Sequence, residues 1–591
     1  MAVLMWSRRE GAEHLPPLLL FLFACIAYCV TVSTHYHGGD HGIFASVFAK
    51  GGYGHAPGYP LYSMYLRALS WIPATSPAQG AGFATAILGA LSISVFYLAC
   101  RAWGLSSWSA ALGAVVLLID RHMWFIHSQS EVFALNHLFA GALVWLSAPQ
   151  GRVRGSRRIA LLGLLAGLGV SHHHSIVLLA PIGFYGVWLG LRESEHQLKS
   201  LALGLATLAI GLTPYGYLVI VARTSPESLF WGDASTFDGL VHTFLRRDYG
   251  TFKVSTGETP LEPLNQIVFL FRSLAEDTLY LPVLLGVFGI AHRCVAWVRS
   301  RDTEGSGWLL LLVSLMLVGP LFVSLLHLPN EGVAAQVLRK FHLLFDYMFA
   351  FFLVTGADQL VRYLKRPGPR WGLLTGLLML GSLNAYSYCM QLQAPTVQSY
   401  LEWTLETMPE DAVIIGTGDE YYIGFQYLQQ ALNQRPDVQY ISAGLVGARW
   451  YRERLEEQLG TDVTFRGNED LLLLIDTLNA QGRPIYLMNA FDEALLPRPN
   501  YPFVTTIHLA SPGEHVSPPS ELFDQNRALL ATCKLELDPN APKMAWSRTV
   551  LNNGAAIWYS LADALEQTGD PVRAAVARNV AKTMAPWTED P

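Results

Sequence analysis

"LPPLLLFLFACIAYCVTVS", residues 15–33, is an almost uninterrupted apolar run, and it decides the class of fold. A helix of roughly 20 apolar residues crosses the ~30 Å hydrocarbon layer of a bilayer. The rest of the chain has the same character, because 51% of its 591 residues are hydrophobic, 15% are charged and the mean hydropathy is +0.29. We therefore predict an integral membrane protein with many helical spans. The net charge of −6 gives no sign of a nucleic-acid partner.

Eleven segments are apolar enough to be predicted as membrane spans. They are residues 16–34, 82–100, 105–120, 131–148, 159–172, 175–191, 200–222, 277–298, 307–328, 342–361 and 371–390. The third and fifth segments are short for a crossing, so we expect half-helices or parts of broken spans there. No small-residue cleavage site follows the first run, which favours a retained span over a removed signal peptide.

Basic residues between these segments predict the orientation, because short cytoplasmic loops are enriched in Lys and Arg. Basic clusters lie at residues 8–9, 151–158, 292–301 and 362–370. With eleven spans, all four clusters fall on one side of the membrane. We therefore expect a cytoplasmic N-terminus and an extracytoplasmic C-terminal region, with the protein in a bacterial inner (plasma) membrane.

The composition changes near residue 391 from that of a membrane module to that of a soluble domain. Residues 1–390 form the predicted transmembrane module, with large outer loops at 34–81 and 223–276. Alternating strand and helix patterns predict an extracytoplasmic α/β domain over 391–545. Two helical patterns flanking a Gly-Asp-Pro break predict a C-terminal helical hairpin over 546–591.

The first outer loop contains a further helical pattern at residues 59–74. Apolar residues recur there at helical spacing, at Leu61, Met64, Tyr65, Ala68 and Ile72. We expect either an amphipathic helix in the plane of the membrane surface or a helix packed within the bundle.

The stretch "HYHGGDHG", residues 35–42, places an acid close to the end of the first span. A carboxylate near the hydrocarbon boundary is costly unless it is paired, bound to metal or used in chemistry. Asp40 is therefore the catalytic candidate, and the alternative is that it caps the helix that follows. The neighbouring histidines suit a metal ion as ligands together with Asp40, or they are exposed loop residues.

Further polar residues interrupt the apolar pattern on the same predicted face. Glu131 begins the fourth span, either as a substrate contact or as a charge that complements the helix dipole. His172, His173 and His174 interrupt an apolar stretch, and neutral imidazoles donate and accept hydrogen bonds at a sugar or phosphate. Three adjacent residues on a helix point in three directions, so these histidines are not all ligands of one ion.

Two basic groups also fall on this face. Arg246 and Arg247 lie in the second outer loop, and Arg339, Lys340 and His342 lie where the tenth span begins. The planar guanidinium group binds phosphate through paired charge-assisted hydrogen bonds. The alternative for any one of these residues is contact with lipid headgroups. Together they favour an anionic, lipid-linked substrate.

The motifs resemble one known family over nearly the whole chain. "GGDHGIFASVFAKGGYGHAPGYPLY", residues 38–62, is similar to a pattern of Gly-Asp-x-Gly-Glu followed by His-Pro-Pro-Gly-Tyr-Pro-Leu. That pattern opens a GT-C-like membrane family, first catalogued as a domain of unknown function, whose animal member is a transmembrane protein O-mannosyltransferase. Further matches follow in order: "SEVFALN" (130–136), "GLGVSHHHSI" (167–176), "WGDASTFDGLVHTFLRRDYG" (231–250), "MPEDAVIIGTGD" (408–419), "RPDVQYIS" (435–442) and "RWY" (449–451).

The resemblance implies a GT-C fold in which a sugar leaves a polyprenyl-phosphate carrier for an acceptor on the outer face. By position, it makes Asp40 the catalytic acid candidate. It implies substrate contacts for His55, Glu131, His173, His174, Trp231, Asp233, Arg246 and Arg247. The chain departs from the pattern at Ile43, where the family has its second carboxylate, and at Ala56, where it has a proline.

These observations lead to one preferred function, a membrane glycosyltransferase that moves mannose or a similar hexose from a polyprenyl-phosphate carrier. Asp40 accepts the proton of the acceptor hydroxyl as the general base. Arg246, Arg247 and Arg339 stabilise the charge on the departing phosphate, and Lys340 and His342 complete the basic group. The expected partners are the lipid-linked donor, membrane lipid and an acceptor protein or glycan.

No cofactor is required by this scheme, and a divalent cation such as Mg²⁺ or Mn²⁺, held by Asp40, is compatible with it. The sequence is also compatible with two other functions. One is a transporter or flippase for a lipid-linked saccharide, although such proteins place polar groups near the midplane of repeated halves. The other is an envelope assembly protein that acts through its soluble tail.

Overall fold

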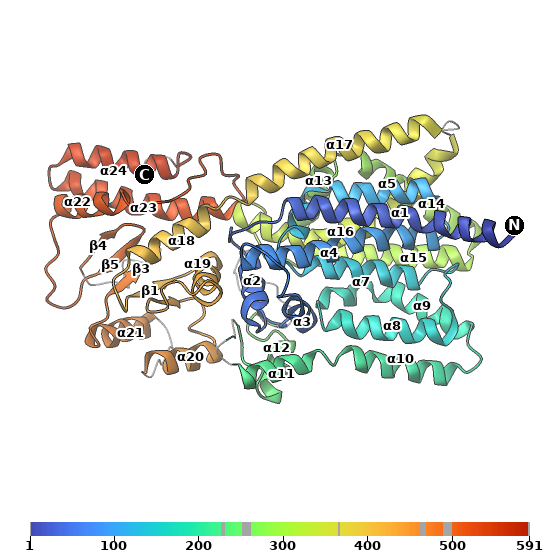
Figure 1. Cartoon of the computed structure of the whole chain (residues 1–591), viewed down its shortest axis with the longest axis horizontal. Helices are drawn as coiled ribbons and strands as arrows, with labels where there is room; N and C mark the ends of the chain where they lie inside the picture. The colour runs from blue at the N-terminus through green and yellow to red at the C-terminus, as the bar shows by residue number, and fades with distance from the viewer. Residues whose placement is uncertain are drawn as a thin grey trace. The chain divides into compact units, whose positions relative to one another are not determined.

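The computed structural model describes residues 2–588, apart from 226–227, 229–230, 251–261, 364–366, 461–467 and 489–498. The chain forms two compact units (Figure 1). The first unit contains residues 1–34, 51–229 and 234–390, and the second contains 35–50, 230–233 and 391–591. Two pieces of the predicted outer loops, residues 35–50 and 230–233, pack with the C-terminal region.

The first unit is a bundle of helices, many of which run side by side (Figure 1). Its elements are α1 (Ala2–Val30), α3 (Pro60–Ala68), α4 (Pro77–Ala102), α5 (Ser107–Ile119), α6 (Arg121–His127), α7 (Phe133–Leu146), α8 (Gly155–Val170), the short 3₁₀ helix η1 (His174–Leu179), α9 (Ala180–Arg192), α10 (Gln197–Gly211), α11 (Tyr215–Thr224), α12 (Phe237–Phe244), α13 (Pro263–Asp277), α14 (Leu281–Ser300), α15 (Thr303–Met316), the π-helical turn η3 (Leu317–Leu321), α16 (Gly332–Tyr363) and α17 (Pro367–Leu392).

Each of the eleven predicted spans coincides with one of these helices or with a consecutive pair of them. Among the described residues, six helices are long and apolar enough to cross a membrane by themselves, and a seventh follows if one bent pair is a single span. The chain is thus a polytopic helical membrane protein, and the count of eleven crossings stays a prediction.

The bent pair is α5 and α6, whose axes differ by 69°. Asp120 lies at the break, and its side chain accepts hydrogen bonds from the backbone amides of His122 and Met123 at 3.1 and 2.9 Å. A side chain that binds these amides begins a new helix at the point where the previous one ends. This geometry explains why the short segment 105–120 reads as part of a broken span.

The predicted amphipathic helix at 59–74 is shorter, and a different face of it is buried. Helix α3 ends at Ala68, and its buried side chains include Tyr62, Ser63 and Leu66, whereas Met64 is exposed. The tyrosine hydroxyl of Tyr62 lies 2.6 Å from the Thr85 hydroxyl of α4. This helix is therefore packed within the bundle, which is the second of the two expected alternatives.

The second unit is an α/β domain with a mixed sheet. Its elements are α2 (His41–Lys50), α18 (Thr396–Thr407), β1 (Val413–Gly416), α19 (Asp419–Gln426), the π-helical turn η4 (Tyr427–Ala431), β2 (Gln439–Ser442), α20 (Arg449–Leu459), α21 (Asn468–Ala480), β3 (Ile485–Leu487), β4 (Asn500–Phe503), β5 (Thr506–Leu509), α22 (Pro519–Leu530), α23 (Trp546–Gln567) and α24 (Pro571–Met584).

The strand order is β2-β1-β3-β5-β4, with β1 parallel to both β2 and β3 and with β5 antiparallel to β3 and β4. Helices α22, α23 and α24 lie on one side of the sheet and α21 on the other (Figure 1). The predicted hairpin coincides with α23 and α24, which meet at Gly569 and Asp570. Its apolar faces close a core with Trp403 and Phe523.

Candidate functional site

The predicted site residues divide between the two units. Asp40, Trp231 and Asp233 belong to the second unit. The other nine belong to the first unit: His55, Glu131, His173, His174, Arg246, Arg247, Arg339, Lys340 and His342.

In the first unit, the three adjacent histidines occupy the turn between α8 and η1 and have three different partners. The Nε2 atom of His172 lies 2.7 Å from the Val132 carbonyl oxygen. The Nδ1 atom of His173 lies 2.8 Å from the Ser175 hydroxyl, and the Nε2 atom of His174 lies 3.1 Å from the Tyr215 hydroxyl. The three rings therefore diverge, as the sequence predicts.

His173 connects to the predicted His55 through Tyr59. The Tyr59 ring stacks on His173 with centroids 5.7 Å apart, and its hydroxyl lies 3.4 Å from Nε2 of His55. Tyr59 is held at this place by the turn before α3, where its own backbone has a φ of 43°. The sequence pointed to His55 but not to Tyr59, although Tyr59 is part of the Gly-Tyr-Pro motif.

Arg246 supplies positive charge close to His173 and His174. Its guanidinium group lies over the Tyr249 ring, 5.3 Å from the centroid, and its charge acts on His173 and His174. Among the residues that the structure describes, no carboxylate pairs with it, and its Nε atom is buried without a hydrogen-bond partner. Arg247 differs, because its side chain is exposed and lies 3.8 Å from Asp238. Of the two, Arg246 has the more enclosed positive charge.

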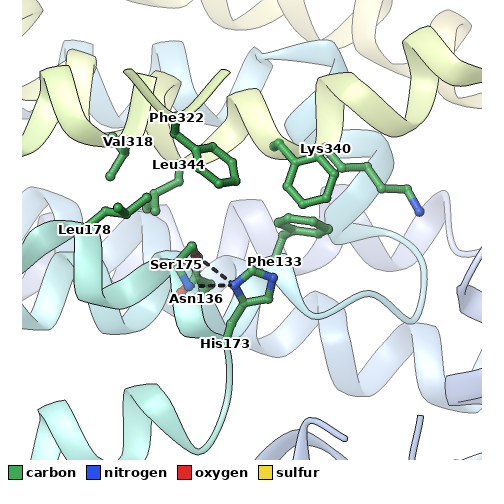
Figure 2. Close-up of a pocket in the computed structure, with 10 residues that line it drawn as sticks. Phe133, Asn136, His173, Ser175, Leu178, Val318, Phe322, Lys340 and Leu344 are labelled. Carbon is green, nitrogen blue, oxygen red and sulfur yellow. Dashed lines mark hydrogen bonds between the residues drawn. The ribbon is translucent and has the colours of Figure 1, made fainter. Parts of the chain in front are cut away.

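His173 also lines a small pocket (Figure 2). Most of its wall is apolar, and the wall residues are Phe133, Asn136, His173, Ser175, Leu178, Val318, Phe322, Lys340, Phe341 and Leu344. The hydrocarbon stem of Lys340 borders the pocket, and its ammonium group points away from the other wall residues (Figure 2). That ammonium forms an ion pair with Glu131, and both side chains are almost fully buried. Two predicted substrate contacts are thus partners of each other.

The remaining basic residues on α16 contact α13. Arg339, which is 3% exposed, donates to Asp277 at 2.8 Å, and Arg121 donates to the same carboxylate at 2.8 Å. The Nδ1 atom of His342 lies 2.7 Å from the Ser273 hydroxyl. A phosphate contact for Arg339 would therefore compete with an ion pair that is already formed.

In the second unit, Asp40 immediately precedes α2. Gly38 and Gly39 have φ values of 105° and 75°, and a Cβ on Gly38 would lie 2.2 Å from the Trp546 ring. Side chains other than glycine are strained in such conformations. The glycine pair therefore lets the chain turn against Trp546 and begin α2 directly after the acid.

Trp231 is surrounded by aromatic side chains of the α/β domain. Its ring lies 5.7 Å from Tyr422 and 5.8 Å from Trp450, measured between centroids. Trp450 belongs to the "RWY" motif, and its indole Nε1 is buried without a hydrogen-bond partner. Asp233 follows in the same short piece of chain, which packs with the second unit. Two motifs that are far apart in sequence thus form one aromatic cluster.

The sequence is also compatible with a divalent metal ion at the site. Within the described residues, no group of three or more His, Cys, Asp or Glu side chains has the geometry to hold one. The residues present do not fit a metal-binding group of that size, and the cation requirement stays a prediction.

Comparison with known proteins agrees with the motifs. Residues 40–197 match the family model for the Protein O-mannosyl-transferase TMEM260 N-terminal domain. A Dictyostelium discoideum relative, Protein O-mannosyl-transferase tmem260, is 24% identical over 521 residues, which are 80% of this chain and 63% of the relative. The Mus musculus Protein O-mannosyl-transferase TMEM260 is 26% identical over 458 residues, which are 74% of this chain and 64% of that protein. The chain thus spans just under two thirds of the length of these relatives.

Among solved structures, the fold is similar to the crystal structure of ArnT from Cupriavidus metallidurans bound to undecaprenyl phosphate. The TM-score is 0.52 at 14% identity, and the match covers 85% of this chain and 99% of that one. At this identity the likeness concerns the fold alone. The family model and the two relatives agree with the resemblance to protein O-mannosyltransferases that the motifs indicate.

Proposed function

We propose that this chain is a membrane glycosyltransferase that moves mannose or a similar hexose from a polyprenyl-phosphate carrier to an acceptor hydroxyl on the extracytoplasmic face. The names of its relatives support the reaction class, and the undecaprenyl phosphate bound to the fold neighbour supports the carrier class. The structural observation that carries the proposal is Arg246, an enclosed guanidinium with no carboxylate partner among the described residues.

The proposed reaction needs one base and one stabilised leaving group. Asp40 takes the proton of the acceptor hydroxyl while that oxygen bonds to the anomeric carbon. The bond between the anomeric carbon and the phosphate oxygen breaks, and the electron pair stays on the polyprenyl phosphate. Arg246, with Arg247 near it in sequence, stabilises this charge by charge-assisted hydrogen bonds. No step is assigned to a metal ion.

The acceptor and the orientation are parts of the same proposal. The names of the relatives favour a protein hydroxyl as the acceptor. The four basic clusters favour a cytoplasmic N-terminus and place the chemistry on the opposite face. Labelling of single cysteines at the exposed positions 568 and 154 by a membrane-impermeant reagent tests the orientation, because only position 568 is expected to react in sealed, right-side-out vesicles.

The reaction is tested with the purified full chain in lipid nanodiscs. Polyprenyl-phosphate mannose and an acceptor peptide are added with and without chelator, and the released polyprenyl phosphate is measured. Because a general base contributes about 10²- to 10⁴-fold, Asp40→Asn should lower kcat at least about 100-fold. Removing one group that stabilises developing charge costs ~10²-fold or more, so Arg246→Gln should lower kcat by about that factor.

Asp563→Asn on the exposed face of α23 is the matched control and should keep wild-type activity. Full activity of Asp40→Asn contradicts the assigned base. Transport of intact lipid-linked sugar across a vesicle membrane, without carrier release, would establish the flippase function in place of the transferase.

A further inference from the structure

The hydrogen bonds of His173 determine which of its two ring nitrogens carries the proton. His173 is the residue before η1, and its Nδ1 atom accepts a hydrogen bond from the Ser175 backbone amide at 3.2 Å. A backbone amide only donates, so Nδ1 has no proton. The imidazole is therefore neutral, and its single ring proton is on Nε2.

Ser175 and Asn136 support this tautomer through a chain of side-chain hydrogen bonds (Figure 2). The Ser175 hydroxyl lies 2.8 Å from Nδ1 of His173 and must donate to it, because Nδ1 has no proton to give. The hydroxyl oxygen in turn accepts from the side-chain amide of Asn136 at 3.0 Å. Asn136 is 1% exposed and belongs to α7 of the bundle. The direction of each bond, from the buried amide to the imidazole, is thus fixed.

The proton on Nε2 is available to a ligand. Among the residues that the structure describes, Nε2 of His173 has no hydrogen-bond partner, and the side chain is only partly buried. Phe133 and Tyr59 pack against the ring, with centroid distances of 5.6 and 5.7 Å. The plane of the imidazole is therefore held, while its N–H donor has no protein acceptor in this part of the chain.

Arg246 supplies positive charge near this donor. Its charge acts on His173. A series of contacts also connects the two side chains, because the Tyr59 hydroxyl lies 3.4 Å from Nε2 of His55. The His55 ring lies 6.4 Å from the Tyr249 ring, over which the Arg246 guanidinium group lies. An N–H donor and a guanidinium group without a carboxylate partner among the described residues together favour an anionic ligand.

We infer that the Nε2–H group of His173 donates to a phosphate oxygen of the lipid carrier, and that Ser175 and Asn136 are positioning residues that fix the tautomer for this bond. The inference rests on the proposed function, and it adds a second donor to Arg246 at the phosphate. A neutral N–H group holds the phosphate before and after the sugar leaves, without exchanging a proton with it. His173 therefore binds the carrier and is neither the acid nor the base of the reaction.

Two amide substitutions test the tautomer. The side-chain amide nitrogen takes the place of Nε2 in His173→Gln and the place of Nδ1 in His173→Asn. Binding of radiolabelled polyprenyl phosphate to the full chain in nanodiscs should stay within about threefold of wild type for His173→Gln and weaken about tenfold or more for His173→Asn, which loses a hydrogen bond to a charged group. Polyprenol, which has no phosphate, should bind equally to all three proteins.

Three results of this binding experiment would overturn the phosphate contact. The first is wild-type affinity of His173→Asn for polyprenyl phosphate, and the second is equal weakening by both substitutions. The third is an equal loss of polyprenol binding. Displacement of the carrier by an equal concentration of inorganic phosphate or of phosphatidic acid would overturn the assignment of the site to the carrier.

The positioning role is tested by a double-mutant cycle. Ser175→Ala should lower kcat/KM for carrier release about three- to tenfold, the usual effect of one hydrogen bond, and Ser175→Thr should restore it. Asn136→Leu should act as Ser175→Ala does. In the His173→Gln chain, Ser175→Ala should change kcat/KM by less than about twofold, because an amide has no tautomer to fix. An equal loss in both chains would mean that Ser175 only supports the fold, which contradicts the inference.

Ser94→Ala is the matched control, with wild-type binding and release expected. Ser94 is a buried serine of α4, and its hydroxyl donates to the Pro17 carbonyl oxygen at 2.7 Å. Melting curves verify that each variant is folded. If the His173 variants do not fold, nitrogen NMR of the wild-type chain with isotope-labelled histidine decides, because a proton on Nδ1 of His173 would overturn the inference. A wild-type chain that binds polyprenyl phosphate but releases no carrier from any polyprenyl-phosphate sugar overturns the transferase and leaves the phosphate contact intact.

Discussion

At the scale of single residues, the buried carboxyl group of Glu420 lowers the stability of the fold when it is ionised. Its carboxyl has a pKa of about 7 in the fold, against 4.5 for the ordinary group, because burial disfavours its charged form. The folded protein therefore binds more protons than the unfolded chain between these two values. Stability must fall as the pH rises from about 4.5 to about 7, which is the opposite of the behaviour of a salt-bridged acid.

This pH dependence of stability leads to a prediction about Glu420→Gln, which removes the charge of the side chain and preserves its shape. The variant should be more stable than the wild-type chain above pH 7, by up to about 3 kcal/mol, because each unit of pKa shift corresponds to about 1.4 kcal/mol. At pH 4.5 the two should differ little. Melting temperatures at pH 5 and pH 8 measure the difference, with Glu406→Gln as the exposed control. A variant that is less stable than wild type at pH 8 would mean that the carboxylate has a stabilising partner.

At the scale of elements, close helix packing depends on glycines in α8 and α10. A Cβ on Gly167 of α8 would lie 2.2 Å from the Leu208 carbonyl oxygen and 2.8 Å from the Gly211 Cα atom. Gly163 has a similar contact with the Gly204 carbonyl oxygen, at 2.1 Å. Small residues let membrane helices approach until their backbones touch, where van der Waals packing replaces the missing hydrophobic drive.

Gly167→Val should therefore separate α8 from α10 and destabilise the bundle by about 1–3 kcal/mol, the usual cost of overpacking. Gly376→Val in α17 is the matched control, because no described atom beyond the local backbone of its own helix lies within 4 Å of a Cβ at that position. Melting of the purified proteins in detergent compares the two. Equal melting temperatures would show that the helices separate without loss of stability.

A second property of the elements is the ionic connection between α6, α13 and α16. Arg121 and Arg339 both donate to Asp277, and Arg339 also lies 3.5 Å from Glu276. Removing one member of a buried ion pair leaves an uncompensated charge, which is far more costly than the pair itself is stabilising. Arg339 therefore stabilises the bundle first, whereas no carboxylate among the described residues pairs with Arg246.

At the scale of the whole molecule, the two units are interleaved in sequence. Residues 35–50 and 230–233 leave the membrane bundle and pack with the C-terminal domain. His35 contacts the Gln393 carbonyl oxygen at 2.6 Å, and the Tyr36 amide donates to the Gln398 side chain at 2.7 Å. The loop that contains Asp40 therefore takes its shape from residues more than 350 positions later in the chain.

Deleting residues 391–591 should consequently abolish carrier release and expose the 35–50 segment, while the spans still insert in the membrane. Limited proteolysis followed by mass spectrometry measures the cleavage within 35–50 in the truncated and full-length chains. The bundle loop at 193–196 provides an internal reference that should be cut equally in both. Protection of 35–50 in the truncated chain would contradict this dependence.

The sequence by itself determined the membrane class, the helical segments, most of the domain elements and the resemblance to one family. These properties follow from local composition and periodicity, since each apolar segment must satisfy its own backbone hydrogen bonds in the membrane. The motifs also brought His55, His173 and Arg246 to attention, and Tyr59 lies among them.

Only the tertiary structure decided which charges have partners. Lys340 is neutralised by Glu131 and Arg339 by Asp277, whereas Arg246 has no acidic partner among the described residues. It also decided that the Tyr36 hydroxyl donates to the Glu420 carbonyl oxygen, 384 positions later in the chain. Electrostatic interactions depend on distance in space and on burial, and neither can be obtained from spacing along the chain when the partners are hundreds of residues apart.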